Sequence, residues 1–338
     1  MAVTQGDVAA RAGVAPRTVS NVINHFPHVS DAVRTRVEAA IEELGYRPNR
    51  AAQDLRRGRS DTIGLILPEI DLGYFGEIGR LIIEQAKARG FVVLIAQTLG
   101  DLDREVQTID RFIGQQPAGL LISPIGISRD SIAEHIKGTP IVLLGEQTTD
   151  DSVHVAIDNV SAARLCADHL IEQGCRSIAF IGRAPSAGLE MAEMRLRGYR
   201  EALDNAGLPV DERLVRVVSG YHRTDGYTAT RELLQTGVPF DGLLCATDLH
   251  AFGALRALAD SDIDVPGDVA VVGFDNLDDC AYSTPRLTSL APDKARLASA
   301  ALEILLAQIN KHDFPDYRDV AQAFRLEVRE SSVRRPAP

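Results

Sequence analysis

The sequence predicts a mixed α/β protein, in which a small helical unit precedes a two-lobed body built on two parallel sheets. Three observations support this class. The first sixty residues contain short amphipathic patterns with helical spacing. From residue 61 onward, short apolar runs alternate with longer amphipathic ones. The alternation then occurs a second time in a chain of 338 residues, which is long enough for two or three cores.

Charge divides the chain into the same two parts. The formal net charge is -11, but residues 1–60 hold nine Lys and Arg against six Asp and Glu, a balance of +3. The remaining residues hold 27 basic against 41 acidic side chains, a balance of -14. A modest positive unit on an acidic body allows a protein to bind DNA at one end without adhering to it everywhere.

Capping signals define two short helices of the N-terminal unit. Thr4 followed by Asp7 resembles a capping box, which predicts a helix over about 5–12 that ends at Gly13. Ser30 is a favourable N-cap for a later helix. The buried stripe of that later helix is expected to consist of Val33, Val37, Ala40, Ile41 and Leu44.

The helix between these two carries a polar face suited to nucleic acid. Pro16 fits the first position of a helix over 16–24. Arg17 and Asn21, four residues apart, share the face opposite its apolar stripe, so the arginine could donate to guanine and the asparagine could pair with adenine. A helix-turn-helix unit presents its second helix to the major groove in this way. From spacing alone, a generic three-helix domain with a solvated polar face remains the alternative.

The first sixty residues resemble the headpiece of the lactose-repressor family of bacterial transcription regulators. The match runs without a gap through the segments DVA, AGV, TVS, HVS and LGYRPN. The resemblance implies that Pro16, Arg17 and Asn21 face base edges. It implies phosphate contacts for Thr4, Thr18, Ser20, Asn24, His28, Ser30, Asn49 and Arg50. Ala15 departs from the family, which usually has a capping Ser there, so the second helix has a cap weaker by roughly 1 kcal/mol.

The segment RPNRAAQDLRRGRS, residues 47–60, resembles the hinge of the same family. The resemblance implies a short helix that forms when two copies meet on DNA, with Leu55 inserted into the minor groove as a wedge. A helix of about eight residues is marginal alone in water. Four arginines, Arg50, Arg56, Arg57 and Arg59, would lie close to phosphates. The alternative is a plain basic linker with Leu55 buried against the core.

The body from residue 61 onward resembles the effector-binding core of this family, which is similar to periplasmic sugar-binding proteins. Its expected strands are apolar runs such as TIGLILPEI, AGLLISP, GLLCAT and VAVVGF. We expect a headpiece over 1–48, a hinge helix and linker over 49–60, and a core over 61–338. The core is expected to divide into an N-lobe (about 61–159 and 291–321) and a C-lobe (about 160–290 and 322–332). The crossings are expected near 158–162, 288–293 and 319–324.

Polar and aromatic side chains at the strand ends are candidate effector contacts, because ligands of open α/β sheets bind at the carboxyl ends of strands. The resemblance implies that Arg195 is the effector-binding arginine and that Tyr221 stacks on the ligand. The full candidate set is Asp71, Tyr74, Phe75, Ser123, Asp158, Arg195, Tyr221, Thr247, Asp248 and Asp275. Each taken alone could instead be a helix cap or a turn former. Carboxylates, Arg and aromatic rings together suit a sugar or a sugar derivative, with a nucleobase as the alternative.

Departures from the family pattern fall inside this pocket. Leu72 and Gly73 stand where the family often has Asn-Pro, and Thr247 stands where it often has Asn. The effector therefore cannot be copied from any one relative. Whether it releases the protein from DNA or recruits it stays open.

The remaining expectations concern partners and class. We expect a repressor that forms a homodimer through the first lobe, including the helix around 76–89 and the stretch near Tyr282. A dimer is favoured over a tetramer, because no leucine-heptad tail follows the last strand. The absence of a signal peptide or an apolar membrane run predicts a cytoplasmic protein, and the four cysteines are expected to be buried thiols. No membrane partner is expected.

An enzyme and a pure solute-binding protein are the rival classes. The glycines at 73, 76 and 79 have GxxGxxG spacing, which fails the dinucleotide fingerprint, and no GxSxG or HExxH motif is present. Neither a cofactor nor a metal is expected. A solute-binding protein or a sugar-acting enzyme without a DNA role remains the alternative function.

Overall fold

The computed structural model describes residues 3–47, 60–127, 129–136, 138–145, 153–183, 190–313 and 318–334. The chain divides into two compact units, Met1–Asp61 and Thr62–Pro338, and each is described by itself. Within the described residues, no helix is both long enough and apolar enough to cross a membrane.

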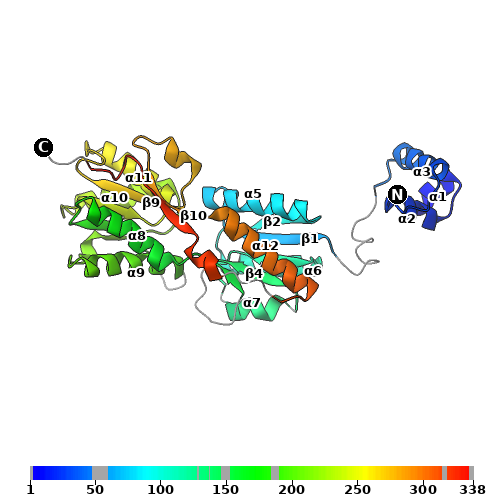
Figure 1. Ribbon diagram of the computed structural model, residues 1–338, viewed down its shortest axis with the longest axis horizontal. Coiled ribbons are helices and arrows are strands. Elements are labelled where there is room, and N and C mark those ends of the chain that lie inside the picture. The colour runs from blue at the N-terminus through cyan, green and yellow to red at the C-terminus, as the bar shows by residue number, and fades with distance from the viewer. Residues whose placement is uncertain are drawn as a thin grey trace. The chain divides into compact units, whose positions relative to one another are not determined.

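The described residues of the first unit form three helices, which are α1 (Gln5–Ala12), α2 (Pro16–Ile23) and α3 (Asp31–Leu44). The three expected helices are therefore confirmed, and Figure 1 labels them. The predicted capping box is present at α1, where the Thr4 hydroxyl and the Asp7 carboxylate each accept a backbone N–H of the other residue. Ser30 occupies the predicted N-cap position of α3, although its side chain makes no capping bond. Small apolar side chains of all three helices form the core, namely Val8, Ala9, Ala12, Val19, Val22, Val37 and Ala40.

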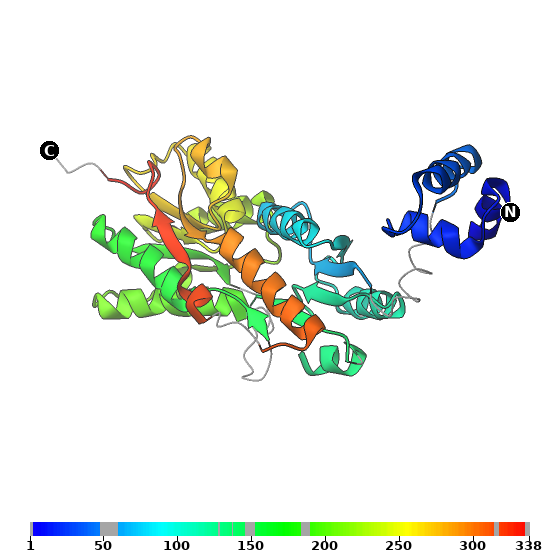
Figure 2. The same ribbon diagram turned by 45° about the vertical axis from the view of Figure 1, so that its right-hand side comes forward.

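The second unit begins with a parallel sheet of order β2-β1-β3-β4-β5. We call this sheet and its helices the N-lobe. Its strands are β1 (Thr62–Leu67), β2 (Val92–Gln97), β3 (Gly119–Ile122), β4 (Ile141–Leu144) and β5 (His154–Val155). Its helices are α5 (Gly73–Ala88), α6 (Leu102–Gly114), α7 (Arg129–Ile136) and α12 (Lys294–Asn310). Figures 1 and 2 show α5 and α12 side by side on the sheet, and the two helices are in contact.

Alternation along β1 explains why both faces of this sheet are covered. Ile63 and Leu65 belong to the cluster under α5 and α12, whereas Ile66 belongs to the cluster under α6 and α7. Successive side chains of a strand point to opposite faces, and a strand buried on both faces is apolar throughout. Gly64 is required for packing, because a Cβ there would lie 2.6 Å from the Phe112 ring.

The second sheet, with its helices, forms the C-lobe. Its order is β11-β10-β9-β8-β6-β7, and β11 alone among the described strands pairs antiparallel. The strands are β6 (Ile178–Arg183), β7 (Val215–Val217), β8 (Gly242–Cys245), β9 (Ala270–Phe274), β10 (Thr288–Pro292) and β11 (Phe324–Glu327). One face is covered by α8 (Asn159–Glu172) and α9 (Glu190–Asn205), and the other by α10 (Arg223–Gln235) and α11 (Asp248–Ala259). Short 3-10 turns occur at η1 (Glu212–Leu214), η2 (Asp278–Ala281) and η3 (Arg318–Gln322).

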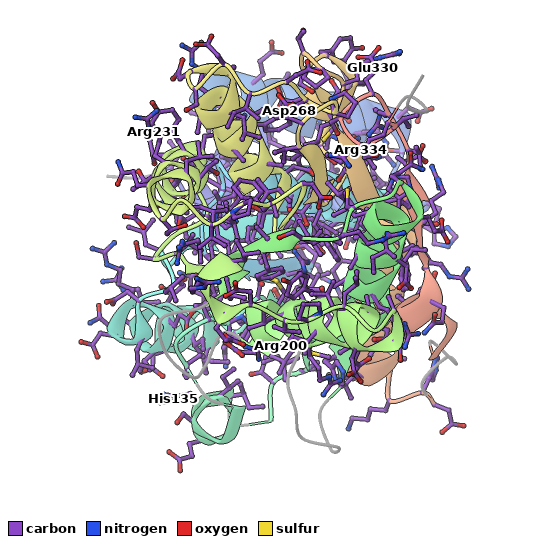
Figure 3. All side chains as sticks on the ribbon, turned by 90° about the vertical axis from the view of Figure 1, so that its left-hand side faces the viewer. His135, Arg200, Arg231, Asp268, Glu330 and Arg334 are labelled. Carbon is purple, nitrogen blue, oxygen red and sulfur yellow. The ribbon has the colours of Figure 1, made fainter. Side chains whose placement is uncertain are left out.

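The chain interleaves the two lobes. It leaves the N-lobe after β5, returns to it between β10 and α12, and ends in the C-lobe with β11. Residues 328–334, which follow β11, are tied into the C-lobe. There Ser331 and Ser332 are fully buried, and Arg334 donates to the carbonyl oxygen of Asp268 at 2.8 Å. Figure 3 labels Asp268 and Arg334. The expected α/β class with two largely parallel sheets is confirmed, and all four cysteines are buried free thiols.

Candidate nucleic-acid interface and interlobe cleft

Helix α2 has one buried face and one polar face, as the spacing predicted. Val19 and Val22 are 0% and 2% exposed and hold the helix against α1 and α3. Arg17 is exposed and Asn21 is half-buried on the other side. Ala15 provides no side-chain cap, and Pro16, which has no backbone N–H, starts the helix. This arrangement suits contact with base edges and phosphates.

The residues expected to contact phosphate differ in how their side chains are used. The Thr4 hydroxyl donates to the Asp7 carboxylate at 2.7 Å, and the Asn24 amide donates to the Ser20 carbonyl at 2.8 Å. His28, which is exposed, lies edge-on to the Phe26 ring. The other residues of this unit that are expected to contact phosphate have exposed or half-buried side chains. These are Thr18, Ser20 and Ser30. The predicted contacts of Asn49, Arg50 and Leu55 lie outside the described residues.

Arg195 is the centre of the candidate effector site. It projects from α9, is 7% exposed, and its Nε donates to Asn159 Oδ1 at 2.7 Å. Its Nη1 donates to the carbonyl oxygen of Ala246, its Nη2 lies 3.9 Å from Asp275 Oδ1, and its guanidinium stacks 3.4 Å above the Phe274 ring. These partners fix the plane of the guanidinium before any ligand arrives.

The turn that carries Asp275 is strained. Asp275 and Asn276 follow β9 with φ values of 111° and 47°. A non-glycine residue with such a φ persists only where its surroundings hold it, and such residues concentrate at functional sites. Burial raises the pKa of the Asp275 carboxyl to about 7, against the opposing attraction of Arg195.

Asp248 is buried within the C-lobe, and its carboxylate oxygens accept hydrogen bonds from residues of the same lobe. It is 0% exposed, and it accepts hydrogen bonds from the Leu277 N–H at 2.8 Å, the Ser289 hydroxyl at 2.6 Å and the Cys280 thiol at 3.1 Å. Burial raises its pKa to about 6. These bonds hold the turn that carries Asp275, and they give no support to the predicted contact between Asp248 and an effector.

Two residues that the sequence did not single out join the lobes near Tyr221. The imidazole Nε2 of His222, just before α10, lies 3.2 Å from the Glu69 carboxylate, which follows β1 of the N-lobe. Tyr221 itself stacks on His250 with ring centroids 6.1 Å apart, and His250 Nε2 pairs with the Gly220 carbonyl oxygen at 2.9 Å. In the sequence, the only indication of the contact between His222 and Glu69 is that each residue follows a predicted strand.

The N-lobe candidates divide by environment. Tyr74 and Phe75 pack edge to face and contact the cores of both lobes. Ser123 is 9% exposed at the end of β3, and its loop is organised by Glu105, whose buried carboxylate accepts the N–H groups of residues 125–127 at 2.7–3.0 Å. Burial raises the pKa of Glu105, although these three bonds oppose the shift.

The last three candidates have local structural roles or open surroundings. Asp158 caps α8 by accepting the Ser161 N–H at 3.0 Å, and the Thr247 hydroxyl caps α11 by accepting the His250 N–H at 3.2 Å. Asp71 is exposed. The capping roles do not prevent ligand contact, but they are the structural alternative that the sequence left open.

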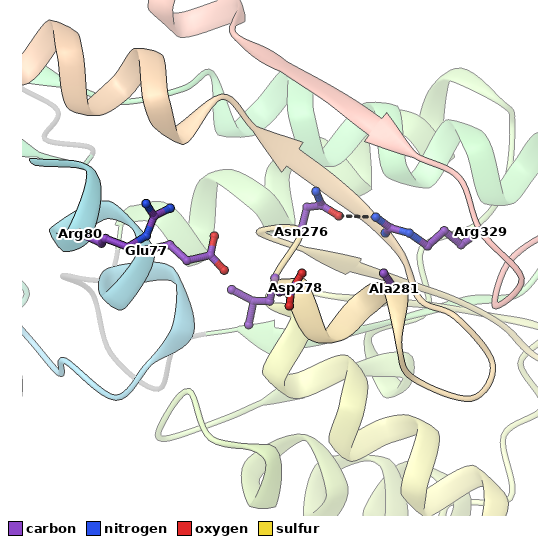
Figure 4. A pocket seen from close by; sticks show the side chains of 7 residues that line it. Glu77, Arg80, Asn276, Asp278, Ala281 and Arg329 are labelled. Atoms are coloured by element: carbon purple, nitrogen blue, oxygen red, sulfur yellow. Dashed lines mark hydrogen bonds between the residues drawn. The ribbon is translucent and has the colours of Figure 1, made fainter. Parts of the chain in front are cut away.

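A pocket of about 440 Å³ lies between the lobes and contains none of the ten candidate effector residues. It is lined from the N-lobe by Glu77 and Arg80 of α5 and from the C-lobe by Asn276, Leu277, Asp278, Ala281 and Arg329. Figure 4 shows the α5 side chains facing this C-lobe segment, with Arg329 bonded to Asn276. Among the residues that the structure describes, no cluster of His, Cys, Asp and Glu could hold a metal ion.

Comparison with known proteins identifies both units. Residues 4–49 match the model of bacterial regulatory proteins of the lacI family, and residues 167–332 match that of a periplasmic binding protein-like domain. The chain is 32% identical over 333 residues to the HTH-type transcriptional regulator GalR of Escherichia coli (strain K12), covering 98% of this chain and 96% of that protein. The chain belongs to the LacI family of bacterial regulatory proteins.

Solved structures of the LacI family agree over nearly the whole length. The lac repressor dimer bound to operator and the anti-inducer ONPF has a TM-score of 0.84 at 26% identity, covering 98% of this chain and 100% of that chain. The complex of the transcriptional regulator CelR with cellobiose has a TM-score of 0.71 at 32% identity, covering 97% of this chain and 99% of that chain. The present LacI-family protein is therefore a DNA-binding transcriptional regulator, as the sequence predicted.

Proposed function

We propose that this LacI-family protein is a repressor that binds a pseudo-palindromic operator as a homodimer. The observation that carries the proposal is the polar face of α2. Arg17 and Asn21, four residues apart in sequence, lie on this face because a buried apolar stripe anchors the opposite side of the helix. In this proposal Pro16, Arg17 and Asn21 read base edges. Leu55 opens the central base step from the minor groove.

We further propose that a sugar or sugar derivative binds in the cleft between the lobes and controls operator affinity. The support is chemical, because vicinal hydroxyls suit the Arg195 guanidinium and the Asp275 carboxyl, while Tyr221 offers an aromatic face. The related regulator CelR has been solved as a complex with cellobiose, which is a sugar. A nucleobase is the alternative ligand. A ligand shifts the lobes only by its difference in affinity for their two arrangements.

Exposed apolar side chains on both lobes support the proposed dimer. Val92, Leu94 and Ile95 of the edge strand β2 are 39%, 42% and 43% exposed, and Ile83 of α5 is 38% exposed. Tyr282 of the C-lobe is 79% exposed. An exposed edge strand with apolar side chains is a pairing hazard unless another surface covers it. A second copy of this chain covers it in our proposal.

The proposal also covers the domain boundaries, the location in the cell and the absence of catalysis. We infer a headpiece over 1–48, a hinge over 49–60 and a core over 61–338, in a cytoplasmic protein without enzymatic activity. The similar protein GalR is a transcriptional regulator, which supports a regulatory role without catalysis. Turnover of a bound sugar by the purified protein would argue for the rival enzymatic function.

The test of DNA recognition is selection of duplex sites from a random library by the full chain, followed by competition against random DNA. Arg17→Ala should relax the preference at one base position per half-site and weaken specific binding by about 1–3 kcal/mol per contact. Arg36→Ala, which removes an exposed arginine of α3, is the matched control and should leave the preference unchanged. A uniform loss across all sequences in Arg17→Ala would contradict base reading.

A further inference from the structure

Lys294 is a buried cation at the boundary between the lobes. It is the first residue of α12, directly after the chain crosses from the C-lobe sheet, and it is 8% exposed. Its Nζ donates to Glu77 Oε2 of α5 at 2.5 Å and to the carbonyl oxygen of Asn276 at 3.2 Å. A buried ammonium is tolerated only when charged and hydrogen-bonding partners compensate its lost hydration. The two partners that do so belong to different lobes.

The C-lobe partner of Lys294 is part of the strained turn that carries Asp275. The Asn276 N–H donates to the Ser289 hydroxyl at 2.9 Å, and the Asn276 side-chain oxygen accepts from Arg329 at 2.7 Å. With the Asn276 carbonyl bonded to Lys294, this residue is held at three points. Asn276 follows Asp275 directly in the chain, so a movement of the Asp275 backbone shifts the carbonyl oxygen that accepts from Lys294.

Electrostatics connect the same groups. The charge of Lys294 lowers the pKa of Asp275 and of Asp248, whereas Glu77 raises that of Asp275, although burial is the dominant effect on both aspartates. Lys294 therefore lies in the field of the candidate effector site while it is bonded to an N-lobe helix. The pocket of about 440 Å³ adjoins this point, with Glu77 and Asn276 in its lining. Lys294 therefore joins the two lobes, through Glu77 and Asn276, at the edge of this pocket.

We propose that Lys294 is the positioning residue that couples the Asp275 turn of the C-lobe to α5 of the N-lobe. A ligand that bonds to Asp275 or Arg195 displaces the turn, and Lys294 transmits that displacement to Glu77. The two hydrogen bonds of Lys294, to Glu77 and to Asn276, then favour one arrangement of the lobes over the other. This inference rests on the proposed function, in which the Asp275 turn belongs to the effector site.

The experiment measures the distance between the lobes in the full chain without any ligand. Spin labels are placed at Arg111→Cys on α6 and at Glu232→Cys on α10, both exposed positions, while the four native cysteines are buried. Labelled chain is diluted with unlabelled chain, so that only distances within one chain are recorded by pulsed electron paramagnetic resonance. Lys294→Met and Glu77→Gln should each broaden the distance distribution relative to the unsubstituted chain.

The control and the double variant separate a bridge from a general loss of packing. Lys311→Met removes an exposed lysine at the other end of α12 and should leave the distribution unchanged. The double variant Lys294→Met/Glu77→Gln should be no broader than the broader single variant, because both changes break one interaction. Additive broadening would overturn the coupling role.

Two further outcomes are decisive. If the circular dichroism spectrum shows that Lys294→Met does not fold, the test is made with Glu77→Gln, because this variant keeps the lysine and its bond to Asn276. Distributions that match the unsubstituted chain in the folded variants overturn this inference. Duplex selection by the unsubstituted chain is measured in parallel, and failure there overturns the proposed function without altering the distance result.

Discussion

Replacing Asp275 by Asn is expected to flatten the dependence of the core's stability on pH. Burial places the pKa of this carboxyl at about 7 in the folded chain, above its usual value of 3.8. The folded state therefore holds the proton more tightly than the unfolded state, and the free energy of unfolding falls as pH rises from about 4 to about 7. Asn keeps the shape of the side chain and tolerates a positive φ, but it cannot ionise.

The size of the effect follows from the shift. At about 1.36 kcal/mol per pKa unit, one group moved from 3.8 to about 7 lowers the free energy of unfolding by roughly 2–3 kcal/mol between about pH 5 and pH 8. Asp248 acts in the same sense with a smaller shift. His169 and His250 act in the opposite sense, because burial lowers the pKa of each. The difference between the unsubstituted chain and Asp275→Asn isolates the Asp275 contribution.

The assay is urea unfolding of the full chain followed by far-ultraviolet circular dichroism, since the sequence has no Trp. The gain in stability of Asp275→Asn over the unsubstituted chain should be larger at about pH 8 than at about pH 5 by roughly 2–3 kcal/mol. Asp278→Asn, an exposed aspartate three residues further, is the control and should show no such difference. Parallel pH profiles for the unsubstituted chain and Asp275→Asn would refute the assignment of a proton to Asp275.

Three other substitutions test separate parts of the core. Gly182→Ala would drive a Cβ into the Ala246 Cβ at a φ of 132°, so we expect a loss of about 3–5 kcal/mol in urea unfolding, and a loss below about 1 kcal/mol would contradict the packing. Glu105→Ala leaves the N–H groups of residues 125–127 without their acceptor, and that of Ile127 is buried, so we expect a loss of about 1–3 kcal/mol in urea unfolding, with faster amide exchange there. Arg195→Ala should abolish stabilisation by any ligand found in a thermal-shift screen of sugars and nucleobases while duplex binding persists, and a normal ligand response would move the pocket elsewhere.

Local spacing was sufficient to predict the elements but not the contacts between them. The Thr4 to Asp7 capping box and the apolar strands could be read directly, because three residues or a few alternating positions define each of them. Arg195 was selected by resemblance, yet its bond to Asn159 follows only from the packing of α9 on α8. Lys294 and Glu77 are 217 residues apart in sequence, and nothing local marks either as a partner of the other.

Asp248 and Ser30 show where local reasoning failed to discriminate. An acidic residue after a strand has the same sequence signal whether it faces a ligand or accepts bonds from its own lobe, and Asp248 does the latter. Ser30 is well placed to cap α3, but a hydroxyl can rotate away from the helix, and here it makes no capping bond. Burial and rotamer choice decide both cases, and neither is encoded in residue type and spacing alone.

The interleaving of the lobes has a consequence for synthesis on the ribosome. Neither sheet can acquire its full complement of covering and pairing elements while translation is still within the first 290 residues, since α12 belongs to the first sheet and β11 to the second. The nascent chain must hold both partial sheets with apolar faces open until the last elements emerge, a period in which chaperone binding competes with misassembly. The α1 to α3 unit has no such dependence, because its core is complete once Tyr46 has left the exit tunnel.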